Sequence, residues 1–326
     1  MTRSRTILLA TALLLAPTSP IPAVGVEDPP AVDQTLPEYR PEGRPSGKVT
    51  SIGSSTTTAL LEQLADAFRQ IHPEVAFDFD TGGSASAPPA LASGQSQMAP
   101  MSRPMTDAEV ADVKLRRGAA PVDLRIAVDA LGFFVHPDNP IDALDRAQLK
   151  SVFGDAAGGP TTWGELGATG DEWATRGIVR FIPLSSQGSF GVMRSDLLGD
   201  GRYHVDAVPG TVASELIQGV VADPRGITFV SLFFRTPRAR LIGVRDESGV
   251  VVMPTPQDCA SGRYPFARHL HLYVVPSAGG VAPPALAEFI RFVYSRQGQT
   301  IVAREGFTPV SASLAAEAMK SLGIAR

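Results

Sequence analysis

Hydrophobic positions along the chain switch between the spacing of a strand and the spacing of a helix. Short apolar or alternating runs at Val49–Ile52 and Val75–Phe79 predict strands. Between them, leucine, alanine and phenylalanine recur at helical spacing over Thr56–Ile71, which predicts an amphipathic helix. The long β-rich run Leu124–Val135 predicts another strand, which ends at turn residues that begin with His136.

The same switching continues to the end of the chain. We predict further helices at Ala87–Ser93, Asp107–Arg117, Arg146–Phe153, Thr162–Leu166, Ser189–Leu198, Thr211–Val221, Pro284–Ser295 and Ala312–Leu322. We predict further strands at Val179–Pro183, Gly226–Leu232, Arg240–Val244 and His269–Val275. Strands that alternate with helices are typical of mainly parallel sheets covered by helices, so the sequence predicts an α/β protein. In such folds, ligands bind at the carboxyl ends of strands, beside helix N-termini.

The first 23 residues have the pattern of a cleavable signal peptide. Arg3 and Arg5 precede the apolar run Ile7–Ala16, which is too short to span a bilayer, and Ala23 suits the end of the leader. A buried N-terminal helix is the alternative, but the order of charge, apolar run and small residues favours export. No cysteine follows the apolar run, so we expect no lipid anchor there. We expect the protein in the periplasm or secreted.

Residues 24–46 form a proline-rich, polar lead-in before the first predicted strand. This composition predicts an extended tether or a surface strap.

Composition and charge exclude several classes of function. The chain has 326 residues, 44% hydrophobic and 19% charged, which suits a soluble globular protein with two domains sharing a cleft. The formal net charge is −4 and no basic run stands out, so nucleic acid is not an expected partner. Cys259 is the only cysteine, and His269 and His271 have no further ligand at suitable spacing, so we expect no metal site.

Three predicted strand-to-helix junctions share glycine, hydroxyl side chains and a helix start. They are Gly53–Thr56, Gly82–Ser86 and Ser185–Ser189. Glycine lets the backbone approach closely, hydroxyls donate hydrogen bonds, and the first N–H groups of a helix have no partner within it. Each junction can therefore hold a desolvated anion, although plain helix capping is the simpler explanation of any single one.

Arg103 is the candidate cation for such a site. It follows an apolar segment and precedes the predicted helix at Asp107. A guanidinium can give two parallel hydrogen bonds to a tetrahedral oxyanion, whereas a surface ion pair is the default for a lone arginine. Three junctions together with one arginine predict an oxyanion site.

Several segments resemble those of a known family. Gly53–Thr56, Gly82–Leu91 and Met98–Pro104 resemble the oxyanion-binding segments of periplasmic phosphate-binding proteins, the solute receptors of phosphate ABC transporters. Further matches follow in the family's order at Ile126–Leu131, Gln148–Phe153, Thr162–Leu166, Ser295–Gln299 and Gly306–Val310. The resemblance extends from about Val49 to the C-terminus.

The resemblance implies a two-lobed periplasmic-binding-protein fold of type II, with a ligand cleft between the lobes and two interlobe crossovers. Lobe one would comprise residues 47–128 and 270–326, and lobe two residues 129–269. Hinge closure would trap phosphate and present the closed form to an inner-membrane ABC permease, for uptake or sensing. The resemblance implies a monomeric binding protein that is not an enzyme and needs no cofactor.

The resemblance also assigns the site residue by residue. One oxyanion wall would be formed by Ser54, Ser55 and Thr56. Further hydroxyls and a charge would come from Ser84, Ser102 and Arg103. In lobe two, the family's Ser-Gly-Thr turn corresponds to Gln187, Gly188 and Ser189.

Two departures from the family leave its ligand open. The family usually has an arginine four residues before the Ser-Gly-Thr turn, where this chain has Pro183. It often has a site carboxylate that accepts the proton of monohydrogen phosphate, where this chain has Ser55 or Arg103. Asp129, near the expected lobe crossover, could substitute for that carboxylate. The alternative is a degenerate relative that keeps the fold but binds another oxyanion or a protein partner.

A secreted serine hydrolase is the third hypothesis. The chain has no Gly-x-Ser-x-Gly elbow, and no base and orienting acid can be named for a serine nucleophile. The segment Gly43–Lys48 resembles a phosphate loop only superficially, because its spacing is wrong and it precedes a strand.

Overall fold

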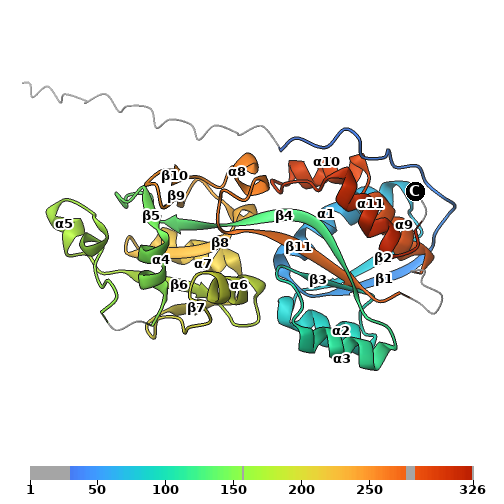
Figure 1. Cartoon of the computed structure of the whole chain (residues 1–326), viewed down its shortest axis with the longest axis horizontal. Coiled ribbons are helices and arrows are strands. Elements are labelled where there is room, and N and C mark those ends of the chain that lie inside the picture. Colours follow the sequence, from blue (N-terminus) through green and yellow to red (C-terminus); the bar gives the residue numbers. More distant parts are fainter. Residues whose placement is uncertain (1–29, 156–157, 277–282, 325–326) are drawn as a thin grey trace, which may run out of the picture.

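The computed structural model describes residues 30–155, 158–276 and 283–324. The predicted signal peptide lies outside these residues. Two groups of helices and strands lie at the two ends of an elongated molecule and are joined by two long strands, β4 (Val122–Val135) and β11 (Ala267–Val274) (Figure 1). We call the group with β1 to β3 lobe one and the group with β5 to β10 lobe two. Within the described residues, no helix is long and apolar enough to cross a membrane.

The strands of each lobe continue from β4. In lobe one the order is β2 (Val75–Asp80), β1 (Gly47–Ile52), β3 (Met98–Met101), β11 and β4, with β1 parallel to β2 and β3. In lobe two, β4 is followed by β8 (Gly226–Ser231), β6 (Val179–Pro183) and β7 (Val208–Gly210). A branch from β4 adds β9 (Arg240–Arg245), β5 (Ala143–Asp145) and β10 (Val251–Val252). Parallel pairs form within each lobe, as expected. However, β11 is antiparallel to β3 and β4, and β4 is antiparallel to β8 and β9, so the sheet is less parallel than the sequence predicted.

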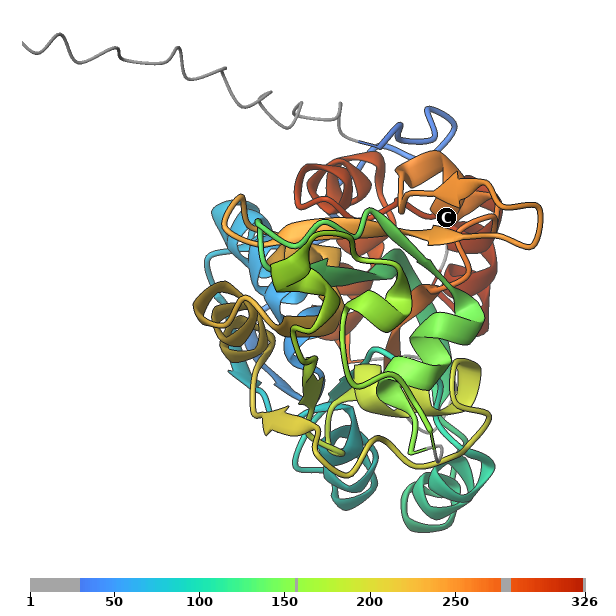
Figure 2. The ribbon, with the colours of Figure 1, turned by 90° about the vertical axis from the view of Figure 1, so that its left-hand side faces the viewer.

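Helices cover the sheet in both lobes. The α-helices of lobe one are α1 (Ser55–Ile71), α2 (Ala87–Ser93), α3 (Asp107–Arg117), α9 (Pro284–Val293), α10 (Arg296–Arg304) and α11 (Ala312–Ser321). Those of lobe two are α4 (Arg146–Phe153), α5 (Asp171–Ala174), α6 (Gly188–Asp196), α7 (Ala213–Ala222) and α8 (Pro256–Ala260). Short 3-10 turns occupy Ser84–Ser86, Gly164–Leu166 and Leu232–Phe234. Figure 2 looks along the long axis from the lobe-two end.

Strand β4 belongs to both lobes, and this explains its length. Its first part, to Ala130, pairs with β11, whereas Leu131–Val135 pair with β8 and, in part, with β9. The two lobes have separate hydrophobic cores, one around Phe68 and Phe289 and one around Phe133 and Phe153. The sheet therefore passes from one core to the other through β4.

The described part of the lead-in, residues 30–46, packs on lobe one. Leu36 and Tyr39 are buried in its core, and the Tyr39 hydroxyl lies 2.7 Å from the Glu288 carboxylate and 2.6 Å from Nε2 of His72. The Asp33 carboxylate accepts a hydrogen bond from the backbone of Ala312. The segment is therefore a surface strap over helices of lobe one.

Candidate functional site

The carboxyl ends of three neighbouring strands bring the first two predicted junctions together. The backbone N–H of Ser54, after β1, donates to the Pro100 carbonyl of β3 at 2.8 Å. The N–H of Gly83, after β2, donates to the Gly53 carbonyl at 2.9 Å. A methyl group on Gly53 would lie 2.1 Å from the Pro100 oxygen, so only glycine permits this approach.

The hydroxyls of Ser84 and Ser102 meet in a buried position. Their oxygens lie 3.3 Å apart, and the backbone N–H of Ser102 donates to the Ser84 hydroxyl at 3.1 Å. Ser84 is wholly buried and Ser102 nearly so. Since a hydroxyl oxygen that accepts one hydrogen bond can still donate its own hydrogen, this pair is suited to an acceptor oxygen of a ligand.

The first turn of α1 contributes the next three predicted residues. The hydroxyl oxygen of Ser54 caps the helix by accepting from the Thr57 N–H at 3.4 Å, which is the capping role weighed from the sequence. Ser54 and Thr56 are buried, and Ser55 is half-buried. We call Ser54, Ser55, Ser84 and Ser102 the hydroxyl cluster.

The start of α6 in lobe two lies directly against this cluster. A methyl group on Gly188 would lie 2.3 Å from the Ser102 hydroxyl and 2.5 Å from that of Ser84. The backbone N–H of Ala85 donates to the Ser186 carbonyl at 3.1 Å. The third predicted junction, which carries Ser189, therefore meets the other two where lobe two contacts lobe one.

Gln187 bridges the two lobes instead of capping its own helix. Its side-chain oxygen accepts a hydrogen bond from the Ser55 hydroxyl at 3.3 Å, and its side-chain nitrogen donates to the Thr211 carbonyl at 3.1 Å. The helix α6 has no side-chain cap. The N–H of Phe190 donates to the Gln187 carbonyl at 3.1 Å, which leaves the N–H groups of Gly188 and Ser189 for another acceptor.

Arg103 reaches the same region but is already paired. Its two terminal nitrogens donate to the two carboxylate oxygens of Glu109 at 2.8 and 2.7 Å, and one of them also donates to the Pro104 carbonyl. The side chain passes α6, because a methyl group on Gly191 would lie 3.5 Å from Cδ of Arg103. Of the five guanidinium hydrogens, Nε–H and one on Nη2 are left for another acceptor.

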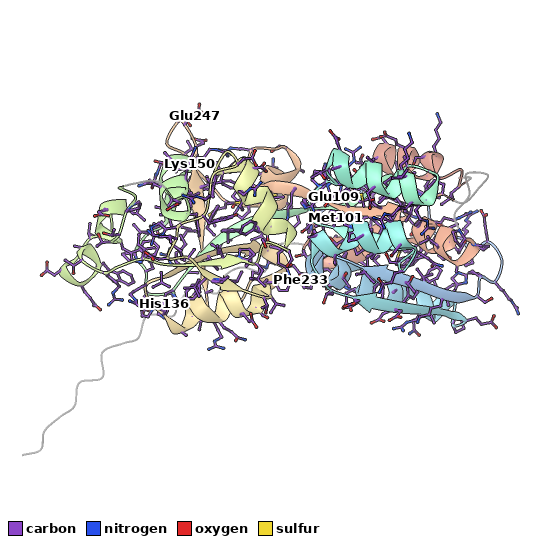
Figure 3. All side chains as sticks on the ribbon, turned by 90° about the horizontal axis from the view of Figure 1, so that it is seen from below. Met101, Glu109, His136, Lys150, Phe233 and Glu247 are labelled. Atoms are coloured by element: carbon purple, nitrogen blue, oxygen red, sulfur yellow. The ribbon has the colours of Figure 1, made fainter. Side chains whose placement is uncertain are left out.

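Glu109 also lies in this region, and its contact with Arg103 was not predicted from the sequence. It lies in the first turn of α3, where it forms a capping box with Thr106. Burial raises the pKa of Glu109, but hydrogen bonds from Arg103 and from the Thr106 backbone outweigh this effect and hold the pKa below its usual range. Figure 3 shows Glu109 and Met101 at the edge of lobe one that faces lobe two.

The residues at or near the two positions where this chain departs from the family pattern have structural roles. Pro183 ends β6 and is buried, and the nearest preceding arginine, Arg180, donates to the backbone carbonyls of Val152, Ile178 and Pro160. The buried carboxylate of Asp129 accepts from the Ser231 hydroxyl at 2.7 Å and from Arg268 at 3.1 Å. Asp129 therefore braces the crossover of β4 and β11.

The two histidines named from the sequence lie on β11. Nδ1 of His271 is 2.8 Å from the Asp123 carboxylate, and the rings of His269 and His271 are 6.3 Å apart. Across residues 30–155, 158–276 and 283–324, no three His, Cys, Asp or Glu side chains are placed to hold a metal ion.

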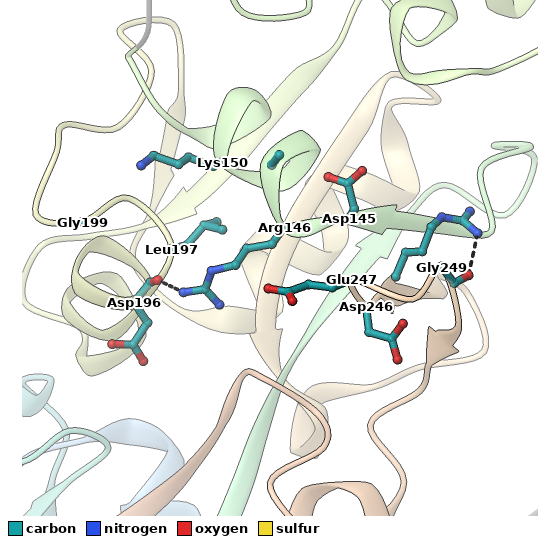
Figure 4. A pocket seen from close by; sticks show the side chains of 11 residues that line it. Asp145, Arg146, Lys150, Asp196, Leu197, Gly199, Asp246, Glu247 and Gly249 are labelled. Atoms are coloured by element: carbon teal, nitrogen blue, oxygen red, sulfur yellow. Dashed lines mark hydrogen bonds between the residues drawn. The ribbon is translucent and has the colours of Figure 1, made fainter.

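A groove of about 690 Å³ lies elsewhere, on the outer surface of lobe two. Its lining mixes cations such as Arg146 and Lys150 with anions such as Asp145 and Glu247 (Figure 4). None of the predicted site residues lines this groove. The meeting of junctions at the hydroxyl cluster, and not the groove, defines the candidate site.

Comparison with known proteins identifies the family. Residues 38–297 match the model of the PBP superfamily domain. The phosphate-binding protein PstS of Pseudomonas aeruginosa is 33% identical over 302 residues, which cover 90% of this chain and 93% of that protein. The chain belongs to the PstS family, within the PBP superfamily. Protein SphX of Synechococcus elongatus is 27% identical over 270 residues, 81% of this chain and 78% of that protein.

Solved structures confirm the two-lobed fold expected for the PstS family. A putative phosphate ABC transporter substrate-binding protein from Clostridium perfringens, solved with bound phosphate, matches with a TM-score of 0.70 at 22% identity, over 81% of this chain and all of that one. An ABC-type phosphate transport receptor from Vibrio cholerae matches with a TM-score of 0.64 at 21% identity, over 80% of this chain and all of that one. The chain therefore has the two-lobed fold of these two proteins.

Proposed function

We propose that this chain captures inorganic phosphate between its lobes as the solute-binding component of a transport or sensing system. The observation that carries the proposal is the meeting of Gly188 from lobe two with Ser84 and Ser102 from lobe one. The three junctions predicted from the sequence converge there in a chain of the PstS family.

The chemistry of this place suits a tetrahedral oxyanion. The N-termini of α1 and α6 supply backbone N–H groups and the positive ends of helix dipoles, and Ser55, Thr56, Ser84, Ser102 and Ser189 supply hydroxyls. Arg103 supplies the remaining guanidinium hydrogens. Because Glu109 balances the charge of Arg103, the anion is held mainly by dipoles.

We further propose how the protein is deployed. Residues 1–23 act as a signal peptide, and the protein works as a monomer in the periplasm or outside the cell. Lobe one comprises residues 47–128 and 270–326, and lobe two residues 129–269. The closed form is recognised by an ABC permease in the membrane.

The alternative of a degenerate relative is disfavoured by the conformation of Gln187. A Gln187 side chain that closed over the site would favour a protein that had lost its ligand. Gln187 does cross to Ser55, but its hydrogen bonds leave the N–H groups at the start of α6 with no side-chain cap. The helix end most suited to an anion is therefore still available.

Calorimetric titration of the purified protein with sodium phosphate at pH 7 tests the proposal. We expect saturable binding with one phosphate per chain. Absence of binding by protein whose unfolding is cooperative would overturn it.

A further inference from the structure

The side-chain oxygen of Gln187 is an unusual group among the candidate site residues. The backbone N–H groups and Arg103 can only donate hydrogen bonds, and the serine hydroxyls can donate or accept. The Gln187 oxygen can only accept, carries no formal charge, and lies 3.3 Å from the Ser55 hydroxyl at the start of α1. It is held in place because the amide nitrogen of the same side chain donates to the Thr211 carbonyl.

Two carboxylates that contact neighbours of the candidate site, Glu109 and Glu215, are turned to other partners. Glu109 accepts from Arg103 and from the Thr106 backbone, and Glu215 accepts from the hydroxyl and the N–H of Thr211 at 2.6 and 2.8 Å. These hydrogen bonds help to hold the pKa of both groups below its usual range. Among the contacts of the described residues, no carboxylate oxygen lies on the hydroxyl cluster or on Gly188.

The hydrogen-bond acceptor beside the ligand determines whether a site discriminates between protonated and unprotonated oxyanions. Phosphate at neutral pH carries a proton that can be donated to an acceptor, whereas sulfate carries none. A buried carboxylate beside the ligand would therefore attract phosphate and repel sulfate, because two negative oxygens would face each other without a hydrogen between them. A neutral amide oxygen can accept the same proton but lacks the charge that repels sulfate.

We infer that Gln187 makes this site select tetrahedral oxyanions by size and shape and not by the proton they carry. Sulfate then binds with an affinity within about tenfold of phosphate, a difference of about 1.4 kcal/mol or less. This inference rests on the proposed function, since it concerns the selectivity of the same site.

Competition calorimetry with sodium phosphate and sodium sulfate at pH 7 tests the inference on the wild-type protein. We expect both anions to bind and each to displace the other. Rejection of sulfate by more than about tenfold relative to phosphate would overturn the inference and leave the proposed function intact. Failure of phosphate itself to bind would overturn both.

The variant Gln187→Glu places a carboxylate oxygen where the amide oxygen lies. We expect the ratio of phosphate to sulfate affinity to rise by about tenfold or more, mainly through loss of sulfate binding. The control Gln95→Glu adds the same charge at an exposed turn after α2 and should leave the ratio unchanged. An unchanged ratio in Gln187→Glu, with cooperative unfolding retained, would remove Gln187 from selectivity.

Discussion

The guanidinium of Arg103 and the carboxylate of Glu109 form a two-pronged ion pair, with contacts of 2.8 and 2.7 Å. Both side chains are mostly buried, with 19% and 23% of their surface exposed. The pair fixes the direction of the guanidinium and balances its charge. In the proposed phosphate site, Arg103 would therefore act as an oriented hydrogen-bond donor more than as a free positive charge.

Replacing Arg103 tests this orientation. We expect Arg103→Ala to weaken phosphate binding by more than tenfold, about 1.4 kcal/mol, because the remaining Nε and Nη2 hydrogens are lost. Arg103→Lys should rescue little, since an ammonium cannot reproduce the planar fork. The control is Arg116→Ala, which removes an exposed ion pair between Arg116 and Asp112 within helix α3. Calorimetry measures the affinities, and wild-type affinity in Arg103→Ala would remove this residue from the site.

The lowered pKa of Glu109 predicts a pH dependence of stability. Its pKa in the folded protein is below the ordinary value of 4.5, so the ionised group stabilises the fold above that pH. This contribution is lost as the pH falls through the lowered pKa. The free energy of unfolding of Glu109→Gln should therefore differ most from wild type above pH 4.5, and the difference should shrink at lower pH.

Urea unfolding of wild type and Glu109→Gln between about pH 3 and about pH 7, a range that brackets the ordinary pKa of 4.5, measures this difference. The control is Glu317→Gln, at an exposed position on α11. The same pH-dependent loss in both variants would contradict a specific role for Glu109.

The helices of lobe one show how much of the fold local sequence determines. The predicted bounds of α2 and α3 match the structure, because Pro88 suits a first turn and a capping box with glycine beyond the C-terminus marks α3. Strand β3 was not predicted, since its four residues include Pro100 and do not alternate. Helix α10 was also missed, because Ser295 and Gly298 at its start are typical of a turn.

The site was predictable only in part. Glycine and hydroxyl residues at helix starts are local signals, and they brought Ser54, Ser84 and Gly188 into the prediction. The contacts of Glu109 with Arg103 and of Gln187 with Ser55 were not predictable, because they depend on how loops pack in three dimensions. The pairing of Ser55 and Gln187 joins residues 132 positions apart, and no periodicity reports such a contact.

Gly188 should be sensitive to any side chain. A methyl group there would lie 2.3 Å from the Ser102 hydroxyl, so Gly188→Ala cannot close in the observed way. We expect loss of phosphate affinity by about a hundredfold or more, with little change in the stability of either lobe, because the contact lies between lobes. The control Gly177→Ala adds a methyl group with its nearest contact at 3.7 Å.

Small-angle scattering and calorimetry distinguish the outcomes for Gly188→Ala. The variant should be more extended than wild type when phosphate is present. A closed shape and unchanged affinity would show that Gly188 does not limit closure.

The strap of residues 30–46 should stabilise lobe one without affecting the ligand site. The Tyr39 hydroxyl lies between two buried groups, the Glu288 carboxylate and the His72 ring, and burial together with the Glu288 contact raises the pKa of Tyr39. In Tyr39→Phe both partners lose a hydrogen bond while the ring keeps its packing against Phe68 and Phe292. We expect a loss of about 1–3 kcal/mol in the free energy of unfolding, the cost of leaving buried polar groups unpaired. Tyr39→Leu should lose more, because ring packing is lost as well.

Urea unfolding measures both variants, and calorimetry should give wild-type phosphate affinity, since the hydroxyl cluster makes no contact with the strap. Equal stability of Tyr39→Phe and wild type would show that Glu288 and His72 find other partners, and weakened phosphate binding would show that the strap acts on the cleft.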